Sequence, residues 1–129
     1  VAPAVAAKRL VRNVNLMAYA IQRQGGVFYF VLQPSIFWTK KQLSPNEKKY
    51  SRADIDYYAQ CRADTLEGLQ GVAHRNFKYF DSSGIFDALD EKTDIFMDRV
   101  HFGQRGNRII AEYLARIVKP SLRQPAPGR

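Results

Sequence analysis

The hydrophobic pattern at the start of the chain predicts one helix followed directly by one buried strand. Over residues 5–24, apolar side chains recur every three or four positions, which is the period of one helix face. Gly25 and Gly26 follow and are typical of a helix end. Residues 27–32 are six consecutive apolar residues, and such a run indicates a strand buried on both faces, as in a parallel sheet. The apolar positions of the predicted helix face are Leu10, Val14, Met17, Ala18 and Ile21.

The rest of the chain predicts three further helices, the first of them short, and one further strand. Residues 44–47 read Ser-Pro-Asn-Glu, a capping-box pattern with proline at the first helical position, so a short helix is expected there. A second cap signal opens a helix over residues 51–69. Residues 77–81 form a short strand candidate, and residues 104–119 carry a clean apolar stripe that predicts a last helix, ended by Pro120.

A helix, a glycine pair and a buried strand make half of a βαβ unit, which places the chain in the α/β class. The strand that should precede the helix is not in this sequence, so we expect the chain to begin in the middle of a domain. Residues 1–122 are then the C-terminal part of a single domain, and residues 123–129 a disordered tail. The polar segment after the first strand is expected either to form a lid or wall over a site or only to pack against the rest of the domain.

Composition narrows the class of protein without naming its function. The chain of 129 residues is 46% hydrophobic and 12% aromatic, which is too rich for an intrinsically disordered protein. No stretch approaches the roughly 20 apolar residues that a membrane-spanning helix needs. The single cysteine, Cys61, excludes an internal disulfide and a multi-cysteine zinc site. Nothing fixes the compartment, and a soluble protein that is secreted or periplasmic fits the sequence.

The net charge of +8 raises nucleic acid as a partner, but the charges lie in blocks. Residues 40–52 and 99–129 are basic, whereas residues 81–98 are acidic. Solvated faces of a soluble protein explain such blocks more simply than a continuous nucleic-acid-binding stripe does. Nucleic acid is therefore an unlikely partner on this pattern.

Two histidines limit where acid–base chemistry near neutral pH could occur. His74 has the sequence context of an exposed or capping residue. His101 follows Asp98 by three positions and precedes the last predicted helix. A carboxylate bonded to one ring nitrogen fixes the imidazole tautomer and leaves the other nitrogen free to take a proton. A surface histidine near a helix start remains the alternative, and no ligand set suggests a metal or another cofactor.

The stretch over residues 94–114 resembles the C-terminal signature block of the SGNH (GDSL-type) hydrolases. It reads Asp-Ile-Phe-Met-Asp-Arg-Val-His-Phe-Gly-Gln-Arg-Gly-Asn-Arg-Ile-Ile-Ala-Glu-Tyr-Leu. The strand that ends in Gln33-Pro34 and the segment at 80–86 resemble earlier parts of that family. The resemblance implies a partial flavodoxin-like three-layer α/β/α sandwich of parallel strands, with the N-terminal strands missing. It also implies hydrolysis of an ester, with His101 as general base and then general acid and Asp98 orienting it.

The sequence departs from that family because it lacks the Gly-Asp-Ser nucleophile block and the Gly-x-Asn-Asp block of the oxyanion hole. Asp81-Ser82 is preceded by Phe80 and falls late in the chain, so neither Ser82 nor Ser83 is expected to be the nucleophile. We therefore expect an inactive C-terminal part with exposed apolar surface on its first strand. Its expected partner is the N-terminal half of the same domain, supplied in the same or a separate polypeptide.

The substrate stays open among esters, thioesters, acetylated sugars and lipid acyl groups. In the resembling family the pocket lies at the C-terminal ends of the strands, which makes Gln33, Phe37 and Trp38 candidate substrate-binding residues, with core packing as the alternative. Two other readings of the chain also remain. One is a basic module that binds nucleic acid or an acidic partner, and the other is a catalytically degenerate relative that keeps the fold for binding.

Overall fold

Three helices and a parallel pair of strands make up the computed structural model, which describes residues 1–50 and 53–122. Strands β1 and β2 pair in parallel, with Phe28 opposite Phe77 and Leu32 opposite Asp81. The predicted α/β arrangement with parallel strands is confirmed. The elements are α1 (Pro3–Arg23), β1 (Phe28–Leu32), a short 3-10 helix (Glu47–Lys49), α2 (Ile55–Gln70), β2 (Phe77–Asp81) and α3 (Gln104–Leu122). The predicted tail at 123–129 lies outside the described residues.

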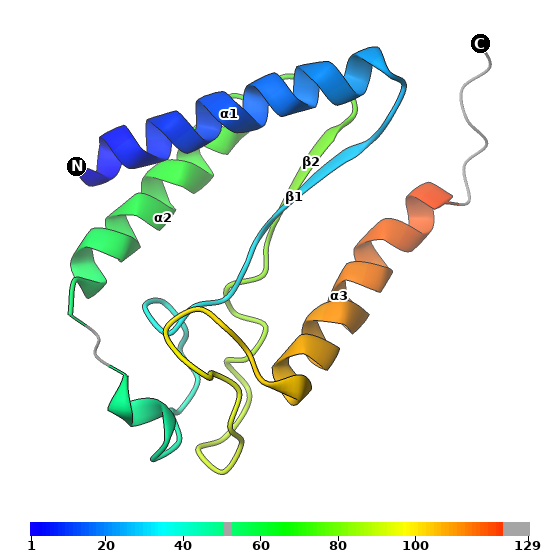
Figure 1. The fold of residues 1–129 in the computed structure, drawn as a ribbon. Helices are drawn as coiled ribbons and strands as arrows, with labels where there is room; N and C mark the ends of the chain where they lie inside the picture. The colour runs from blue at the N-terminus through cyan, green and yellow to red at the C-terminus, as the bar shows by residue number, and fades with distance from the viewer. Residues whose placement is uncertain (51–52, 123–129) are drawn as a thin grey trace.

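Helices α1 and α2 pack against each other on one side of the two strands, and α3 lies on the other side (Figure 1). The close approach of α1 and α2 depends on Gly68, since a Cβ atom there would lie only 2.8 Å from the side chain of Val11. The strands thus run between two helical layers, and both end at the loop-rich end of the molecule.

The buried face of α1 is rotated from the face that the sequence predicted. Its buried residues are Ala7, Val14 and Ala18, whereas Leu10 and Met17 of the predicted stripe are 38% and 46% exposed. The small side chains lie on the buried face, where α2 approaches closely. The prediction was wrong for Leu10 and Met17 because hydrophobicity alone does not tell which part of a wide apolar stripe has a neighbour.

Strand β1 is half-buried along its length rather than buried on both faces. Ring pairs join it to β2, with the centroids of Phe28 and Phe77 5.6 Å apart. The described residues place β2 along one edge of β1 and offer no strand for the other edge. This open edge explains the shortfall in burial, and Val27, just before the strand, is exposed as expected.

Two helix boundaries differ from the predictions for identifiable reasons. Helix α2 begins at Ile55 rather than at residue 51, because Asp54 adopts a left-handed conformation with φ of 65° that a helix cannot contain. Helix α3 continues past Lys119 to Leu122 with Pro120 inside it. Pro120 lacks the N–H that would bond the carbonyl of Arg116, and the helix ends two residues later. The predicted stripe of α3 is half-buried, as its pattern indicated.

The main hydrophobic core lies at the end of the molecule where both strands finish. It joins Ile36 and Phe37 after β1, Phe86 after β2, and Ile95 and Phe96 before α3. The ring of Phe86 is fully buried and meets that of Phe96 edge-on, with centroids 5.8 Å apart. Side chains of α3 pack against this cluster. The core therefore supports the segment that carries Asp98 and His101, because Ile95 and Phe96 at the start of that segment belong to the core.

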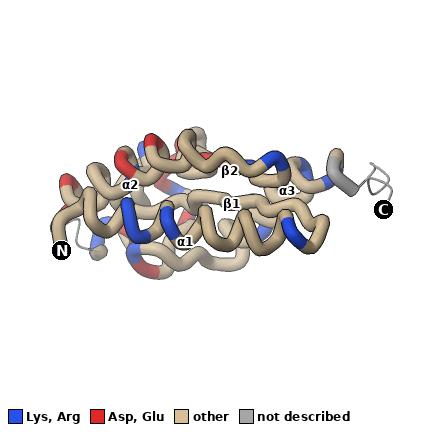
Figure 2. The backbone as a smooth tube through the Cα atoms, turned by 90° about the horizontal axis from the view of Figure 1, so that it is seen from above, with Lys and Arg blue, Asp and Glu red and all other residues tan. Residues whose placement is uncertain are grey.

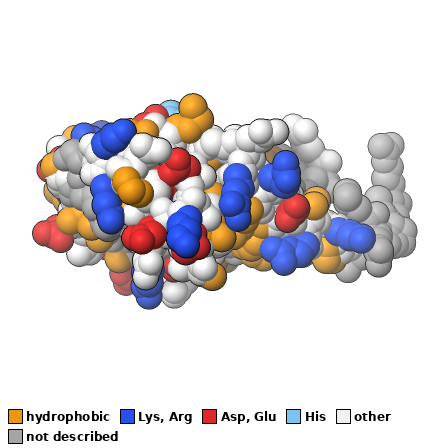
Figure 3. All heavy atoms as spheres, turned by 90° about the horizontal axis from the view of Figure 1, so that it is seen from below, with side chains coloured by type: hydrophobic (Ala, Val, Ile, Leu, Met, Phe, Trp, Pro, Cys, Tyr) orange, Lys and Arg blue, Asp and Glu red, His pale blue; other side chains and the backbone are white. Residues whose placement is uncertain are grey.

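Charge is distributed unevenly over the helices. Helix α1 contains Lys8, Arg9, Arg12 and Arg23 and no acidic residue, whereas α2 carries acidic side chains, as Figure 2 shows. On the face seen in Figure 3, basic side chains are interspersed with acidic ones. One helix therefore carries only basic charges, and the face in Figure 3 carries charges of both signs.

We predict that Phe86→Ala lowers the free energy of unfolding by about 3–5 kcal/mol, because it empties the centre of the core. Leu16→Ala, on the exposed face of α1, is the control and should change it by less than about 0.5 kcal/mol. Denaturant unfolding followed by circular dichroism measures both. Equal effects of the two variants would contradict the placement of the core.

Candidate functional site

Asp98 and His101 lie together in one tight turn directly before α3. One carboxylate oxygen of Asp98 accepts hydrogen bonds from the backbone N–H groups of Val100 and His101, each at 2.8 Å. The other oxygen lies 2.7 Å from Nδ1 of His101. The same carboxylate thus shapes the turn and holds the imidazole ring. The pairing that the Asp-x-x-His spacing predicted is present.

The electrostatics of the pair fix the role of each ring nitrogen. Backbone hydrogen bonds from Val100 and His101, followed by the bond from the His101 ring, lower the pKa of Asp98 to about 2. Asp98 is therefore ionised at neutral pH and can only accept, so Nδ1 of His101 carries the proton. Nε2 of the neutral ring is then free to accept a proton. The two side chains are 48% and 74% exposed, so this nitrogen is accessible.

The turn belongs to a short hairpin-like loop over residues 95–103. The N–H of Met97 donates to the carbonyl of His101 at 2.9 Å, and the N–H of Gly103 donates to the carbonyl of Ile95 at 2.8 Å. Phe96 and Phe102 form an isolated antiparallel bridge between these bonds. Residues 97–101, here called the dyad turn, form the tip of this loop.

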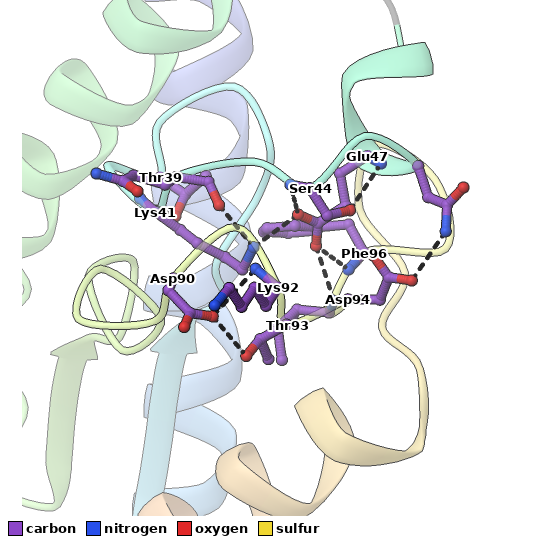
Figure 4. Close-up of polar contacts among 12 residues, drawn as sticks. Thr39, Lys41, Ser44, Glu47, Asp90, Lys92, Thr93, Asp94 and Phe96 are labelled. Atoms are coloured by element: carbon purple, nitrogen blue, oxygen red, sulfur yellow. Dashed lines mark hydrogen bonds and ion pairs between the residues drawn. The ribbon is translucent and has the colours of Figure 1, made fainter.

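A buried carboxylate, that of Glu47, ties this loop to the segment that follows β1 (Figure 4). One oxygen of Glu47 accepts from the backbone N–H groups of Ile95 at 2.7 Å and Phe96 at 2.9 Å. The other accepts from Nζ of Lys41 at 2.7 Å and the N–H of Ser44 at 2.8 Å. Residues 33–50, here called the connecting segment, are thereby joined to the base of the loop.

Three more residues of the connecting segment reach the dyad turn itself. The hydroxyl of Ser35 donates to the carbonyl of Arg99 at 3.0 Å, and the N–H of Ile36 donates to the same carbonyl at 3.0 Å. The hydroxyl of Tyr50 donates to the carbonyl of Met97. The peptide is therefore held on both sides of Asp98.

The capping box predicted at residues 44–47 is confirmed, because the N–H of Glu47 donates to Oγ of Ser44 at 3.1 Å while the Glu47 carboxylate accepts from Ser44. Its second role was missed. Nothing local in the sequence connects Glu47 to Ile95, which lies 48 positions away. Ser35 and Tyr50 were missed for the same reason, since their partners are 64 and 47 positions distant.

The three substrate-binding candidates lie in different surroundings. Gln33 is exposed directly after β1, and Trp38 is half-buried, packed against the core. Phe37 is only 4% exposed, and its ring stacks on that of Tyr58 with centroids 4.0 Å apart. Phe37 therefore contributes to core packing, which was the alternative role, because its ring is buried against Tyr58 and belongs to the core cluster.

Three residues that the sequence did not favour for catalysis make structural contacts. The buried Ser82 donates its hydroxyl to the carbonyl of Leu32 at 2.7 Å, and the buried Ser83 accepts from Arg62 at 2.8 Å. Neither hydroxyl is bonded to His101 in the part of the chain that the structure describes. His74 contacts Asn15 of α1 through Nε2 at 3.1 Å.

An open depression lies beside the dyad and is lined by Lys49, Tyr50, Asp98, Arg99 and Val100. The described residues contain no group of three or more His, Cys, Asp or Glu side chains placed to hold a metal ion. Among the described helices, none is long and apolar enough to cross a membrane. The arrangement offers an oriented imidazole with one free nitrogen, next to a surface that a small substrate could occupy.

Comparison with known proteins identified no relative of this chain. No protein-family model matches the chain, and no curated protein and no solved structure matches it. A functional interpretation therefore depends on the motif and on the geometry of the turn.

We predict that Lys41→Met and Glu47→Gln each lower the free energy of unfolding by about 3–5 kcal/mol, because each leaves one member of a fully buried ion pair without its partner. Lys48→Met, on an exposed neighbour, should cost less than about 0.5 kcal/mol. Denaturant titration at neutral pH measures all three. A Lys41 variant as stable as the Lys48 variant would show that the buried pair contributes little.

The same pair predicts a pH dependence. Burial raises the pKa of Glu47, but hydrogen bonds from Lys41, Phe96, Ser44 and Ile95 outweigh it, and the pKa lies below its ordinary value of 4.5. The contribution of Glu47 is therefore complete above pH 4.5 and is lost as the pH falls through the lowered value. The stability difference between the native chain and Glu47→Gln should shrink between pH 7 and about pH 3. A difference that stays constant would contradict this assignment.

Proposed function

We propose that this chain is the C-terminal part of a serine ester hydrolase of the SGNH (GDSL) type. The observation that carries the proposal is the 2.7 Å contact between the Asp98 carboxylate and Nδ1 of His101, in a turn whose own N–H groups hold that carboxylate. In this role His101 is the general base and then the general acid, and Asp98 orients it.

The proposed chemistry is acyl transfer from an ester to water or another acceptor. Nε2 of His101 takes the proton from a serine hydroxyl as that oxygen attacks the ester carbonyl. The imidazolium, stabilised by Asp98, returns the proton to the leaving alkoxide as the C–O bond breaks. Water then repeats the sequence on the acyl-serine, which releases the acid and regenerates the serine. No cofactor takes part.

The nucleophile and the oxyanion donors are proposed to come from the N-terminal half of the same domain, in the same or a separate polypeptide. The open edge of β1 supports this partner, because a half-buried parallel strand gains burial from a second neighbour. Leu10 and Met17 on α1 are also exposed and would be covered by added strands. With them, the layers of Figure 1 would become a flavodoxin-like three-layer sandwich.

The proposed substrate is an ester or acylated small molecule, including an acylated carbohydrate. Gln33 and Trp38 stay candidates for contacting it, since they lie at the end of β1 where the pocket of such a fold is found. The depression lined by Tyr50 and Asp98 borders the dyad.

Binding of nucleic acid or an acidic partner is the second candidate function, and the purely basic helix α1 is the observation that favours it (Figure 2). The mixed charges in Figure 3 argue against a continuous binding stripe. A catalytically degenerate relative that keeps the fold for binding is a third candidate, and it predicts that no serine becomes reactive.

We predict that a fluorophosphonate, which labels activated serines, leaves this chain unlabelled. When the chain is assembled with the N-terminal half, the label should appear on that half. His101→Gln should slow labelling by about 1,000-fold or more, because the serine loses its base. His74→Gln removes the other histidine and is the matched control. Intact-mass spectrometry over time measures each rate.

Four outcomes would count against the proposal, either against the placement of its nucleophile or against the hydrolase itself. Label on the 129-residue chain would mean that it contains its own nucleophile. Equal rates for the His101 and His74 variants would mean that His101 is not the base. An assembled domain that never becomes labelled would favour the degenerate relative, and salt-sensitive binding of DNA that requires α1 would favour the basic module.

A further inference from the structure

We propose that Ser35, Glu47 and Tyr50 of the connecting segment are positioning residues for the Asp98–His101 pair, and that they hold the dyad turn in its working geometry. The inference deepens the proposed function and rests on it for its catalytic meaning. The contacts that carry it, and the measurements that test it, do not depend on any activity.

The contacts surround the dyad turn rather than being spread along the chain. Ser35 bonds the carbonyl of Arg99, directly after Asp98, and Tyr50 bonds the carbonyl of Met97, directly before it. Glu47 bonds the two N–H groups at the base of the loop, those of Ile95 and Phe96. One segment therefore holds the loop at its base and on both sides of its carboxylate.

External support matters here because the dyad itself is not held by packing. Asp98 and His101 are 48% and 74% exposed, and their mutual bonds are all internal to the turn. A turn anchored only to itself moves and opens more readily, so its internal bonds are made for less of the time. A misplacement of about 1 Å between reacting groups can cost about 100-fold in rate. The anchors from the connecting segment oppose that motion.

The three anchors share one origin, since all lie on the segment that leaves β1. Pro34 and Ser35 are buried directly after the strand, so the start of the segment is fixed to the sheet. Lys41 neutralises Glu47 and lets its carboxylate be buried with one oxygen free for the loop. The position of the dyad relative to the sheet is thereby fixed. A nucleophile on a neighbouring strand would be positioned by the same sheet.

The test compares matched serine and tyrosine variants of the 129-residue chain by NMR. Ser35→Ala and Tyr50→Phe each remove one anchoring hydroxyl and keep the rest of the side chain. Ser82→Ala removes an equally buried hydroxyl that bonds a different carbonyl, that of Leu32. Tyr79→Phe removes a hydroxyl on β2, away from the dyad turn. Carboxyl-carbon titration reports the pKa of Asp98, ring-nitrogen shifts report the His101 tautomer, and hydrogen exchange reports the Val100 and His101 amides.

In the native chain the pKa of Asp98 should lie near 2. We expect Ser35→Ala and Tyr50→Phe to raise it toward the ordinary value of 3.8, because a looser turn makes its hydrogen bonds for less of the time. The Val100 and His101 amides should exchange about tenfold faster. The two control variants should change neither quantity, although Ser82→Ala also loses a buried bond. A merely structural role would lower overall stability without moving these readouts.

The positioning role is overturned if Ser35→Ala and Tyr50→Phe match their controls in both readouts. It is also overturned if the Asp98 pKa is ordinary in the native chain. Because Tyr50→Phe keeps the packed ring, it remains informative if Ser35→Ala fails to fold. Failure of the fluorophosphonate experiment with a positive NMR result would reject the hydrolase and leave the anchoring intact. In an assembled, active domain both variants should lower kcat with little change in KM.

Discussion

The rest of the structure depends on how the Glu47 carboxylate is buried. A carboxylate without solvent requires an opposite charge and a donor for each of its lone pairs, and here Lys41 and three backbone N–H groups supply them. Two of those donors belong to a segment 48 positions or more away. Satisfying one buried charge thus forces the segment after β1 and the loop before α3 together. The dyad turn lies at the tip of what that constraint assembles.

Interactions between near neighbours could be predicted from the sequence, and distant ones could not. The Asp98–His101 pair and the Ser44–Glu47 capping box are formed within three residues, and both were expected from spacing. The helix end at Gly25 and Gly26 follows from the same local chemistry. The anchoring of the loop by Ser35 joins residues 64 positions apart, and no periodicity encodes such a contact.

Errors about burial have one common cause, which is that a pattern reports apolarity and not the neighbour that covers it. Leu10 and Met17 were assigned to the buried face of α1, yet the described chain leaves them 38% and 46% exposed. Phe37 was a candidate for the pocket wall or for core packing, and its burial against Tyr58 fits the second alternative. β1 has the composition of a central strand, and the described residues give it one neighbouring strand. In each case the apolar character of the side chain could be read from the sequence, but the neighbours that surround it could not.

The open edge of β1 also bears on how the chain behaves at high concentration. A strand edge with apolar side chains on both faces is a template for further strands, and it does not distinguish a proper partner from a second copy of itself. Phe28, Phe30 and Val31 carry no charge that would discourage such pairing. Self-association, and recognition by chaperones that bind extended apolar segments, are therefore expected wherever no further strand covers this edge.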